Sequence, residues 1–178
     1  MFLRNSYQDK CISAGAEPLT MKESQPDLLR LFEDVLNTRS RLRVRVTGRS
    51  MSPFLKGGEV LTIRQEPSLS LKKGDLILFR NTFDLPVLHR IIQKRKTNDG
   101  TFCFLTKGDA LIGFDGEIHE DSVLGKVCRI ERPVPSGRTR QSDMDSPFHK
   151  GMNYFIAVLG SFRTRIYFFL SGVPAKKA

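Results

Sequence analysis

The chain has 178 residues, of which 39% are hydrophobic and 27% are charged. This length fits one domain, and this composition excludes wholesale disorder and a polytopic membrane protein. Lys and Arg number 29 against 19 Asp and Glu, giving a net charge of +10. Such an excess is typical of proteins that meet nucleic acid or acidic lipid, and the alternative is a basic protein whose charge only keeps it soluble.

The N-terminal 40 residues are expected to be a flexible lead-in followed by one helix. Residues 1–24 contain no apolar run as long as a signal-peptide core, so we expect no N-terminal membrane anchor. From Leu28 to Leu36, apolar residues recur at helical spacing. They predict an amphipathic helix over 26–38 that docks on the core of the next domain. The segment 1–40 is therefore assigned as lead-in plus helix.

The hydrophobic period changes from helix to strand at residue 41. Leu42, Val44 and Val46 alternate with arginines, which predicts a strand with one buried and one basic face. Asp99-Gly100 is a hairpin turn signal between two later apolar runs. The pattern predicts a mostly β domain over 41–132, built as a single barrel-like or sandwich unit. Its further strands are expected at 59–64, 75–80, 87–93, 101–106 and 123–130.

The C-terminal part divides into a linker and an apolar, basic segment. Residues 133–147 are rich in Pro, Ser and charge, which favours a linker. In the segment 148–178, two apolar blocks flank Arg163 and Arg165, and two arginines near the centre make a spanning helix too costly. Two interpretations stay open: an interfacial helix on anionic headgroups, or a C-terminal helix packed back on the domain.

Cysteine and histidine give no sign of a metal or disulfide framework. The three cysteines are far apart in the chain and form no C-x-x-C pair. The three histidines lack the close spacing of a metal cluster. We therefore expect neither a metal site nor a cofactor.

Three polar residues at the edges of predicted strands form a set suited to acyl transfer. Ser50 follows the first strand, His89 lies within 87–93, and Asp115 follows 101–106. A serine hydroxyl needs a neighbouring base, histidine can serve at neutral pH, and a carboxylate fixes the imidazole tautomer. Singly, each residue has a structural explanation: a turn serine, a core histidine or a capping aspartate. Together and in this order they favour a catalytic site.

Five short motifs follow one another along the predicted β domain. They are G-x-S-M-x-P at 48–53, Lys-Gly-Asp at 73–75, His-Arg at 89–90, Thr-Lys-Gly-Asp at 106–109 and Leu-Gly-Lys-Val at 124–127. Their order resembles the type I signal peptidases, in the branch of the endoplasmic reticulum and archaea that uses histidine as base. This resemblance covers about residues 44–130 and implies the fold of the signal peptidase and LexA-like proteases.

The resemblance assigns roles to individual residues. It implies that Ser50 is the nucleophile, that His89 is the general base, and that Asp115 orients the base, with Asp109 as the alternative acid. Many relatives carry a serine hydroxyl two residues before the nucleophile, where this chain has glycine. A backbone N–H at Ser50 is then expected to contribute to the oxyanion hole. The residues assigned to the oxyanion hole and its turn are Gly48, Arg49, Met51 and Pro53.

The resemblance implies a serine endopeptidase that cleaves signal or leader peptides after small residues. Its partner would be a preprotein or leader peptide. Association with an anionic membrane would come from the surface charge and the C-terminal segment, or the enzyme would work as a soluble cytoplasmic form. Nucleic acid is the weaker partner for the charge. Two other functions stay open: a LexA-like self-cleaving regulator and an inactive peptide-binding module on the same fold.

Overall fold

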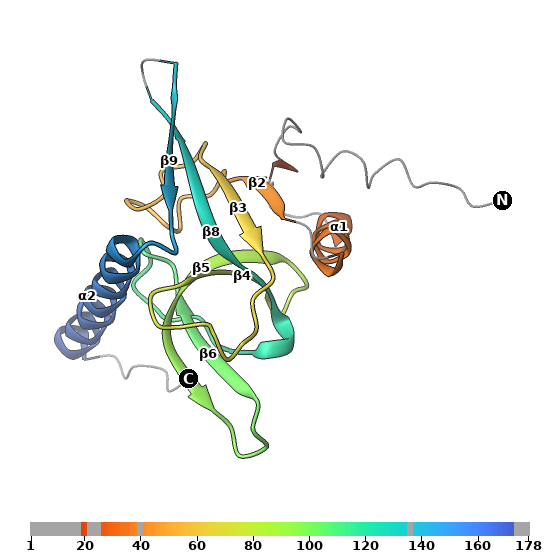
Figure 1. Cartoon of the computed structure of the whole chain (residues 1–178). Helices are drawn as coiled ribbons and strands as arrows, with labels where there is room; N and C mark the ends of the chain where they lie inside the picture. The colour runs from red at the N-terminus through yellow and green to blue at the C-terminus, as the bar shows by residue number, and fades with distance from the viewer. Residues whose placement is uncertain (1–18, 21–25, 39–40, 135–136, 173–178) are drawn as a thin grey trace.

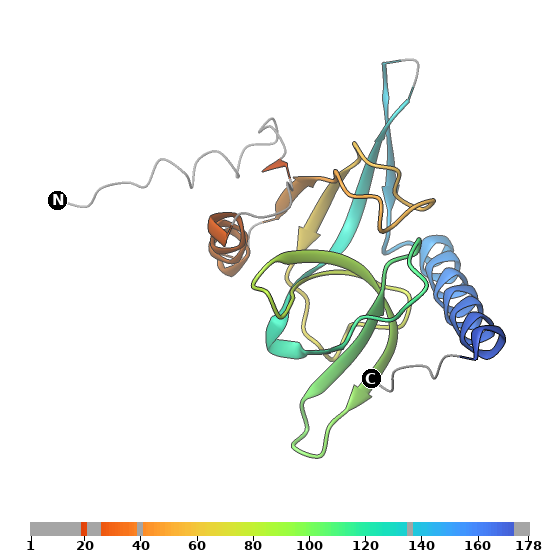
Figure 2. The same cartoon turned by 180° about the vertical axis from the view of Figure 1, so that it is seen from behind.

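A curled β-sheet lies between two helices in the computed structural model, which describes residues 19–20, 26–38, 41–134 and 137–172 (Figures 1 and 2). Helix α1 lies against one side and helix α2 against the other. The elements in chain order are β1 (Leu19–Thr20), α1 (Pro26–Asn37), β2 (Leu42–Arg45), β3 (Val60–Arg64), β4 (Leu76–Arg80), β5 (Pro86–Lys96), β6 (Phe102–Lys107), β7 (Glu117–His119), the 3-10 turn η1 (Glu120–Ser122), β8 (Val123–Pro133), β9 (Thr139–Asp143) and α2 (Pro147–Ser171).

The described strands form one sheet in the order β1-β2-β3-β8-β4-β5-β6-β7, with β9 paired to β8. Every pair is antiparallel except β1 with β2. The sheet curls into a half-barrel, and register shifts in three of its pairings mark the bends that increase its curvature. The expectation of a mostly β domain with a helix at each end is therefore confirmed, and its form is a half-barrel.

The alternation read from the first strand is confirmed by burial. Leu42 and Val44 in β2 are 1% and 0% exposed, whereas Arg45 is exposed and Arg43 is half-buried in a salt bridge with Glu131. The apolar side of α1 packs on the same core through Leu29, Phe32, Val35 and Leu36. The predicted amphipathic helix over 26–38 is therefore confirmed. The lead-in expected over 1–24 falls outside the described residues, apart from the short strand β1.

Strand β4 is buried on both faces, which divides the core into two clusters. Leu76 and Leu78 point into the cluster that α1 covers, while Ile77 and Phe79 point into a second cluster inside the curled part of the sheet. Alternate residues of a strand face opposite sides, so a continuous apolar run is required here. His89 pairs in register with Ile77, which fixes the position of the candidate base within the sheet.

The range 133–147, expected as a linker, contains strand β9. Its residues pair with β8 through the backbone, from Thr139 with Pro133 to Asp143 with Arg129. Of its five residues only Ser142 is buried. A strand exposed on both faces needs no apolar alternation, so its sequence carries the composition of a loop. The predicted hairpin at Asp99-Gly100 does join β5 to β6 as expected.

Helix α2 occupies most of the C-terminal segment. Ser146 caps its first turn, and Gly172 ends it in the left-handed conformation at φ 64°. The helix packs closely on the turn before β4, where a Cβ at Gly74 would lie 2.7 Å from the backbone nitrogen of Tyr154. Within the described ranges, we find no helix whose length and hydrophobicity suffice to span a membrane.

Candidate active site

Ser50 lies in the turn that joins β2 to β3. Its neighbour Met51 is 2% exposed and anchors the turn in the core that α1 covers. The Leu55 amide donates to the Met51 carbonyl at 2.9 Å, which closes the turn. Gly48, Arg49 and Pro53 are exposed, and Ser50 itself is half-buried. Of the motif residues, Met51 is therefore packed in the core, and Gly48, Arg49 and Pro53 face solvent.

His89 and Asp115 are in direct contact. Strand β5 carries the histidine, whose ring is buried, and its Nδ1 lies 2.6 Å from Asp115 Oδ2. The hydroxyl of Thr106 donates to the same carboxylate oxygen at 2.7 Å, and the Asp115 amide donates to the Thr106 carbonyl at 2.9 Å. These bonds hold the carboxylate against one ring nitrogen of the histidine and leave Nε2 for another partner.

The charge state of Asp115 follows from its surroundings. Burial raises the pKa of this carboxyl, but the hydrogen bond and charge of His89 lower it. The Thr106 hydroxyl and the Lys107 ammonium lower it further, and the net pKa of Asp115 lies below its usual range. The group is therefore an anion at neutral pH, as a carboxylate that stabilises an imidazolium must be.

Gly108 brings the serine turn and the histidine ring together. A Cβ placed on this residue would lie 2.7 Å from the Ser50 carbonyl oxygen and 3.0 Å from His89 Nε2. The two groups therefore flank the same backbone position, and only a residue without a side chain fits between them. The Ala110 amide donates to the Ser50 carbonyl at 2.8 Å, which fixes the serine turn to the loop after β6.

Asp109, the alternative acid, is paired elsewhere. Its two carboxylate oxygens accept from Arg90 Nε and Nη2 at 2.8 and 2.7 Å. Arg90 is 0% exposed, and its Nη1 donates to the Gly74 carbonyl and to the Asn153 side chain of α2. Of the two acids, Asp115 therefore contacts the histidine, and Asp109 binds Arg90, the buried residue that follows His89 in the chain.

The ammonium of Lys107 is enclosed beside the site. The side chain is 1% exposed, and its Nζ lies 3.4 Å from the Gly108 carbonyl oxygen. Burial lowers the pKa of Lys107, the charge of Arg163 lowers it further, and Asp109 and Asp115 offset part of the decrease. The protonated lysine places a positive charge close to both carboxylates of the loop.

Several of these roles were not predicted from the sequence. Thr106 and Lys107 belong to the Thr-Lys-Gly-Asp motif at 106–109. Threonine is common in β-strands for structural reasons alone, so the sequence does not predict that Thr106 binds Asp115. Asn153 carries no signal at all, because it reaches Arg90 only through the packing of α2. Among the described residues, no group of three His, Cys, Asp or Glu side chains is arranged to hold a metal ion.

The half-barrel thus sets a serine-bearing turn beside a histidine–aspartate pair, the three residue types of a serine-type acyl-transfer site. No protein-family model matches the chain. A stretch of 61 residues is 31% identical to the signal peptidase complex catalytic subunit SEC11C of Homo sapiens, Mus musculus and Canis lupus familiaris. It covers 34% of this chain and 32% of each relative, so the match spans about a third of the curated proteins' length. This weak, partial similarity supports the resemblance to signal peptidases.

Proposed function

We propose that the protein is a serine endopeptidase with Ser50 as nucleophile, His89 as general base and Asp115 as the residue that orients the base. The observation that carries the proposal is the 2.6 Å contact between the buried ring of His89 and the half-buried Asp115. The Nε2 atom of the same ring lies at Gly108, the residue that the Ser50 carbonyl also approaches. The distant similarity to a signal peptidase subunit supports the same class of reaction.

The proposed reaction runs through an ester on Ser50. His89 Nε2 takes the proton of the Ser50 hydroxyl as its oxygen attacks the carbonyl carbon of the scissile bond. The imidazolium then gives that proton to the leaving amine, and the C–N bond breaks. A water molecule, deprotonated by His89, attacks the ester carbon and releases the carboxylate product, and Ser50 regains its proton. Asp115 stabilises the imidazolium at both stages without taking its proton.

The proposed substrates are signal or leader peptides cleaved after a small residue. The choice of signal peptides rests on the resemblance and on the name of the relatives, which are signal peptidase subunits. The preference for a small residue rests on the resemblance alone. The backbone N–H of Ser50 is the proposed oxyanion donor, since no hydroxyl stands at Gly48. The LexA-like and inactive-module alternatives predict different outcomes in the experiment that follows.

The test combines peptide cleavage with acylation of the enzyme. A quenched peptide with alanine before the scissile bond is incubated with the wild type and with Ser50→Ala and His89→Ala. We expect each substitution to lower kcat/KM by about 10³-fold or more, because nucleophile and base act as one unit. Ser52→Ala changes a serine in the same turn and is the matched control, with cleavage expected at the wild-type rate.

Intact-mass analysis with an activated peptide ester identifies the nucleophile. The wild type should gain one acyl group, mapped to Ser50, and Ser50→Ala should gain none. Cleavage by Ser50→Ala at the wild-type rate would refute the mechanism. A wild-type protein that neither cleaves nor becomes acylated would instead be a binding module, and cleavage confined to its own chain would favour the self-cleaving alternative.

A further inference from the structure

Helix α2 turns polar or small residues toward the sheet and large apolar residues toward solvent. Its three buried residues are Asn153, Ala157 and Thr164, which are polar or small. An ordinary surface helix turns its apolar stripe to the core, but here that stripe faces outward. We define the outer face of α2 as six residues spaced three, four or seven apart, each between 42% and 76% exposed: Phe148, Phe155, Leu159, Phe162, Ile166 and Leu170.

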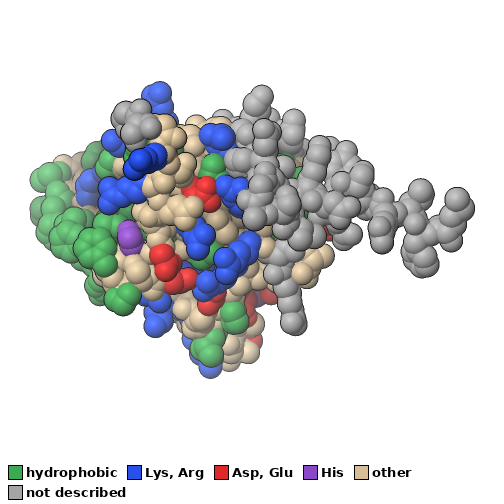
Figure 3. Space-filling model, turned by 45° about the horizontal axis from the view of Figure 1, so that its top comes forward, with side chains coloured by type: hydrophobic (Ala, Val, Ile, Leu, Met, Phe, Trp, Pro, Cys, Tyr) green, Lys and Arg blue, Asp and Glu red, His purple; other side chains and the backbone are tan. Residues whose placement is uncertain are grey.

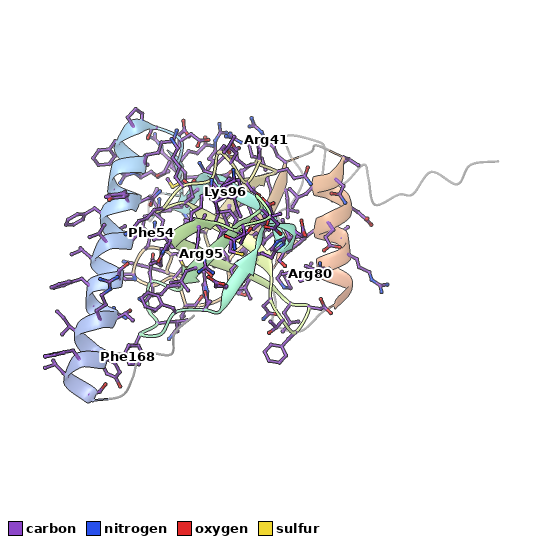
Figure 4. The ribbon with its side chains drawn as sticks, turned by 90° about the horizontal axis from the view of Figure 1, so that it is seen from below. Arg41, Phe54, Arg80, Arg95, Lys96 and Phe168 are labelled. Atoms are coloured by element: carbon purple, nitrogen blue, oxygen red, sulfur yellow. The ribbon has the colours of Figure 1, made fainter. Side chains whose placement is uncertain are left out.

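The outer face is continuous and lies at one edge of the molecule. Figure 3 shows hydrophobic side chains gathered over α2, and in Figure 4 a row of side chains of this helix projects away from the sheet. Single exposed apolar residues are normal on a soluble protein, but a regular stripe along a helix of 25 residues marks a contact surface. At 1.5 Å per residue, such a helix extends about 37 Å.

The charges around this face fit an anionic bilayer. Helix α2 contains no Asp or Glu, and its sequence carries Lys150, Arg163 and Arg165. The two arginines come one and three residues after Phe162, which places them on opposite flanks of the stripe. A groove between the helix and β5 adds Lys73 and Lys94 to its lining beside Arg165. Apolar residues flanked by cations are the pattern of helices that lie in a headgroup layer.

Helix α2 also holds the loop of the candidate active site. Arg163 Nη2 donates to the carbonyl oxygens of Ala110 and Leu111, each at 2.9 Å. The Thr164 hydroxyl donates to the Ile112 carbonyl at 2.6 Å. Leu111 and Ile112 are themselves exposed, so the apolar surface extends from the helix onto this loop. A membrane under α2 would therefore lie next to the loop that contacts the serine turn.

We propose that the outer face of α2 docks in the plane of an anionic lipid bilayer and that this contact places the active-site loop at the bilayer surface. The helix inserts its apolar side among the acyl chains near the headgroups and does not cross. Arg163 and Arg165, with Lys73 at the groove, face the lipid phosphates. This inference is separate from the proposed peptidase activity, because binding to lipid requires no catalysis.

Flotation with vesicles tests the proposal on the full chain. Vesicles of phosphatidylcholine alone are compared with vesicles that contain about a third phosphatidylglycerol, at about 50 mM and about 500 mM salt. We expect the wild type to float with the anionic vesicles and to lose binding several-fold in high salt. The double variant Phe155→Gln/Phe162→Gln should bind about 100-fold more weakly, at roughly tenfold for each phenylalanine withdrawn from the bilayer.

The matched control changes two apolar residues that are more exposed than Phe155 and Phe162 but lie outside α2. Leu69 and Phe83 are 76% and 79% exposed, and the variant Leu69→Gln/Phe83→Gln should float like the wild type. Ser50→Ala should do so as well, which separates this test from that of the peptidase. Circular dichroism and thermal unfolding verify that each variant is folded.

Three outcomes would overturn the proposal. The wild type could stay unbound with anionic vesicles, or the α2 double variant could float as well as the wild type. The third is a wild-type dimer in vesicle-free solution that Phe155→Gln/Phe162→Gln converts to a monomer, without lipid binding by either. In that case the outer face is an interface between two copies of this chain.

Discussion

At the scale of single residues, the Asp115 carboxylate depends on two donors to one oxygen. His89 Nδ1 and the Thr106 hydroxyl both contact Oδ2, at 2.6 and 2.7 Å. The Thr106 hydroxyl donates to the Asp115 carboxylate and is proposed to act through it, so Thr106 is a positioning residue. Its hydroxyl helps to keep Asp115 ionised and aligned with the imidazole.

Replacing this hydroxyl should change the titration of Asp115. Thr106→Val removes a hydrogen bond to a charged group, which stabilises by about 1.5–3 kcal/mol, so the pKa of Asp115 should rise by about one pH unit or more. Asp115 has a lowered pKa in the folded protein, so its stabilising contribution is present above the unfolded pKa and is lost as pH falls through the folded pKa. The variant should therefore be less stable at neutral pH and approach the wild type in acid.

The measurement is an NMR titration of Asp115 together with urea unfolding at several pH values. Thr106→Ser keeps the hydroxyl and should restore both the titration of Asp115 and the stability at neutral pH. A valine variant with an unchanged Asp115 titration would contradict the role given to this residue, even if its stability fell. A purely structural threonine would lower stability at all pH values equally.

The residues of this site could be predicted from the sequence to different extents. Ser50, His89 and Asp115 are predicted from the sequence on two grounds. Each lies at the edge of a predicted strand, and the order Ser, His, Asp matches the order of the motifs in signal peptidases. The choice between Asp115 and Asp109 depends on which of the two carboxylates forms the salt bridge with Arg90. In the structure this is Asp109, and no pattern along the chain predicts that pairing. The contact of Gly108 with both Ser50 and His89 likewise exists only after β5 and β6 have paired.

At the scale of elements, a cluster of ion pairs attaches the start of α2 to the sheet. Asp145, two residues before the helix, lies 3.1 Å from Lys126 in β8 and 3.0 Å from Arg64 in β3. Lys126 is 5% exposed and also pairs with Asp75 at 3.1 Å. Burial lowers the pKa of Lys126, but these two carboxylates raise it above its usual value. The helix is therefore docked by charge as well as by close packing at Gly74.

Removing the carboxylate of Asp145 should destabilise the protein in a pH-dependent way. Burial raises the pKa of Asp145, but Lys126, Arg64 and Lys150 lower it more, so its folded pKa lies below its usual range. Its stabilisation is present above the unfolded pKa of about 3.9 and is lost as pH falls through the lower folded value. Asp145→Asn should cost about 1–2 kcal/mol of unfolding free energy at pH 7, because the pair is only partly buried.

Urea unfolding of Asp145→Asn and the wild type at pH 7 and in strong acid measures this difference. The gap should close as the pH falls through the folded pKa of Asp145, which lies below its unfolded value. Asp84→Asn is the matched control, since its 3.8 Å pair with Arg80 joins an exposed carboxylate, and it should change stability by well under 1 kcal/mol. A gap of equal size at both pH values would show that the asparagine acts through packing and not through charge.

Elements with strong apolar periodicity were predicted, and elements held mainly by backbone pairing were not. Helix α1 and strands β2 to β6 and β8 bury a regular set of residues, so their period is visible in the sequence. Strand β9 buries only Ser142 and depends on hydrogen bonds to β8. The apolar blocks of α2 were recognised, but their outward orientation depends on Asn153 and Thr164 finding partners across the fold.

At the scale of the whole molecule, Arg90 joins segments that are distant along the chain. It binds Asp109 after β6, the Gly74 carbonyl before β4, and Asn153 in α2, which is 63 residues away. Its guanidinium also lies over the ring of Phe54, 4.7 Å from the centroid, in the turn region that follows Ser50. One buried cation thus connects the turn region after Ser50, the loop after β6 and helix α2. We therefore expect these three parts to unfold together.

Arg90→Gln is accordingly expected to destabilise the whole molecule. The substitution leaves Asp109 buried without its partner charge, and breaking a buried pair in this way costs about 3–5 kcal/mol. Arg95→Gln is the control from the same strand, because Arg95 pairs with Glu117 at the surface and should contribute less than about 1 kcal/mol. Urea unfolding is followed by two probes. The absorbance of Tyr154 and Tyr167 reports helix α2, in which both residues lie, and far-ultraviolet circular dichroism reports the sheet and the helix together. Coincident transitions shifted by Arg90→Gln would establish one cooperative unit, whereas loss of helical signal before the sheet unfolds would show that Arg90 stabilises only the docking of α2.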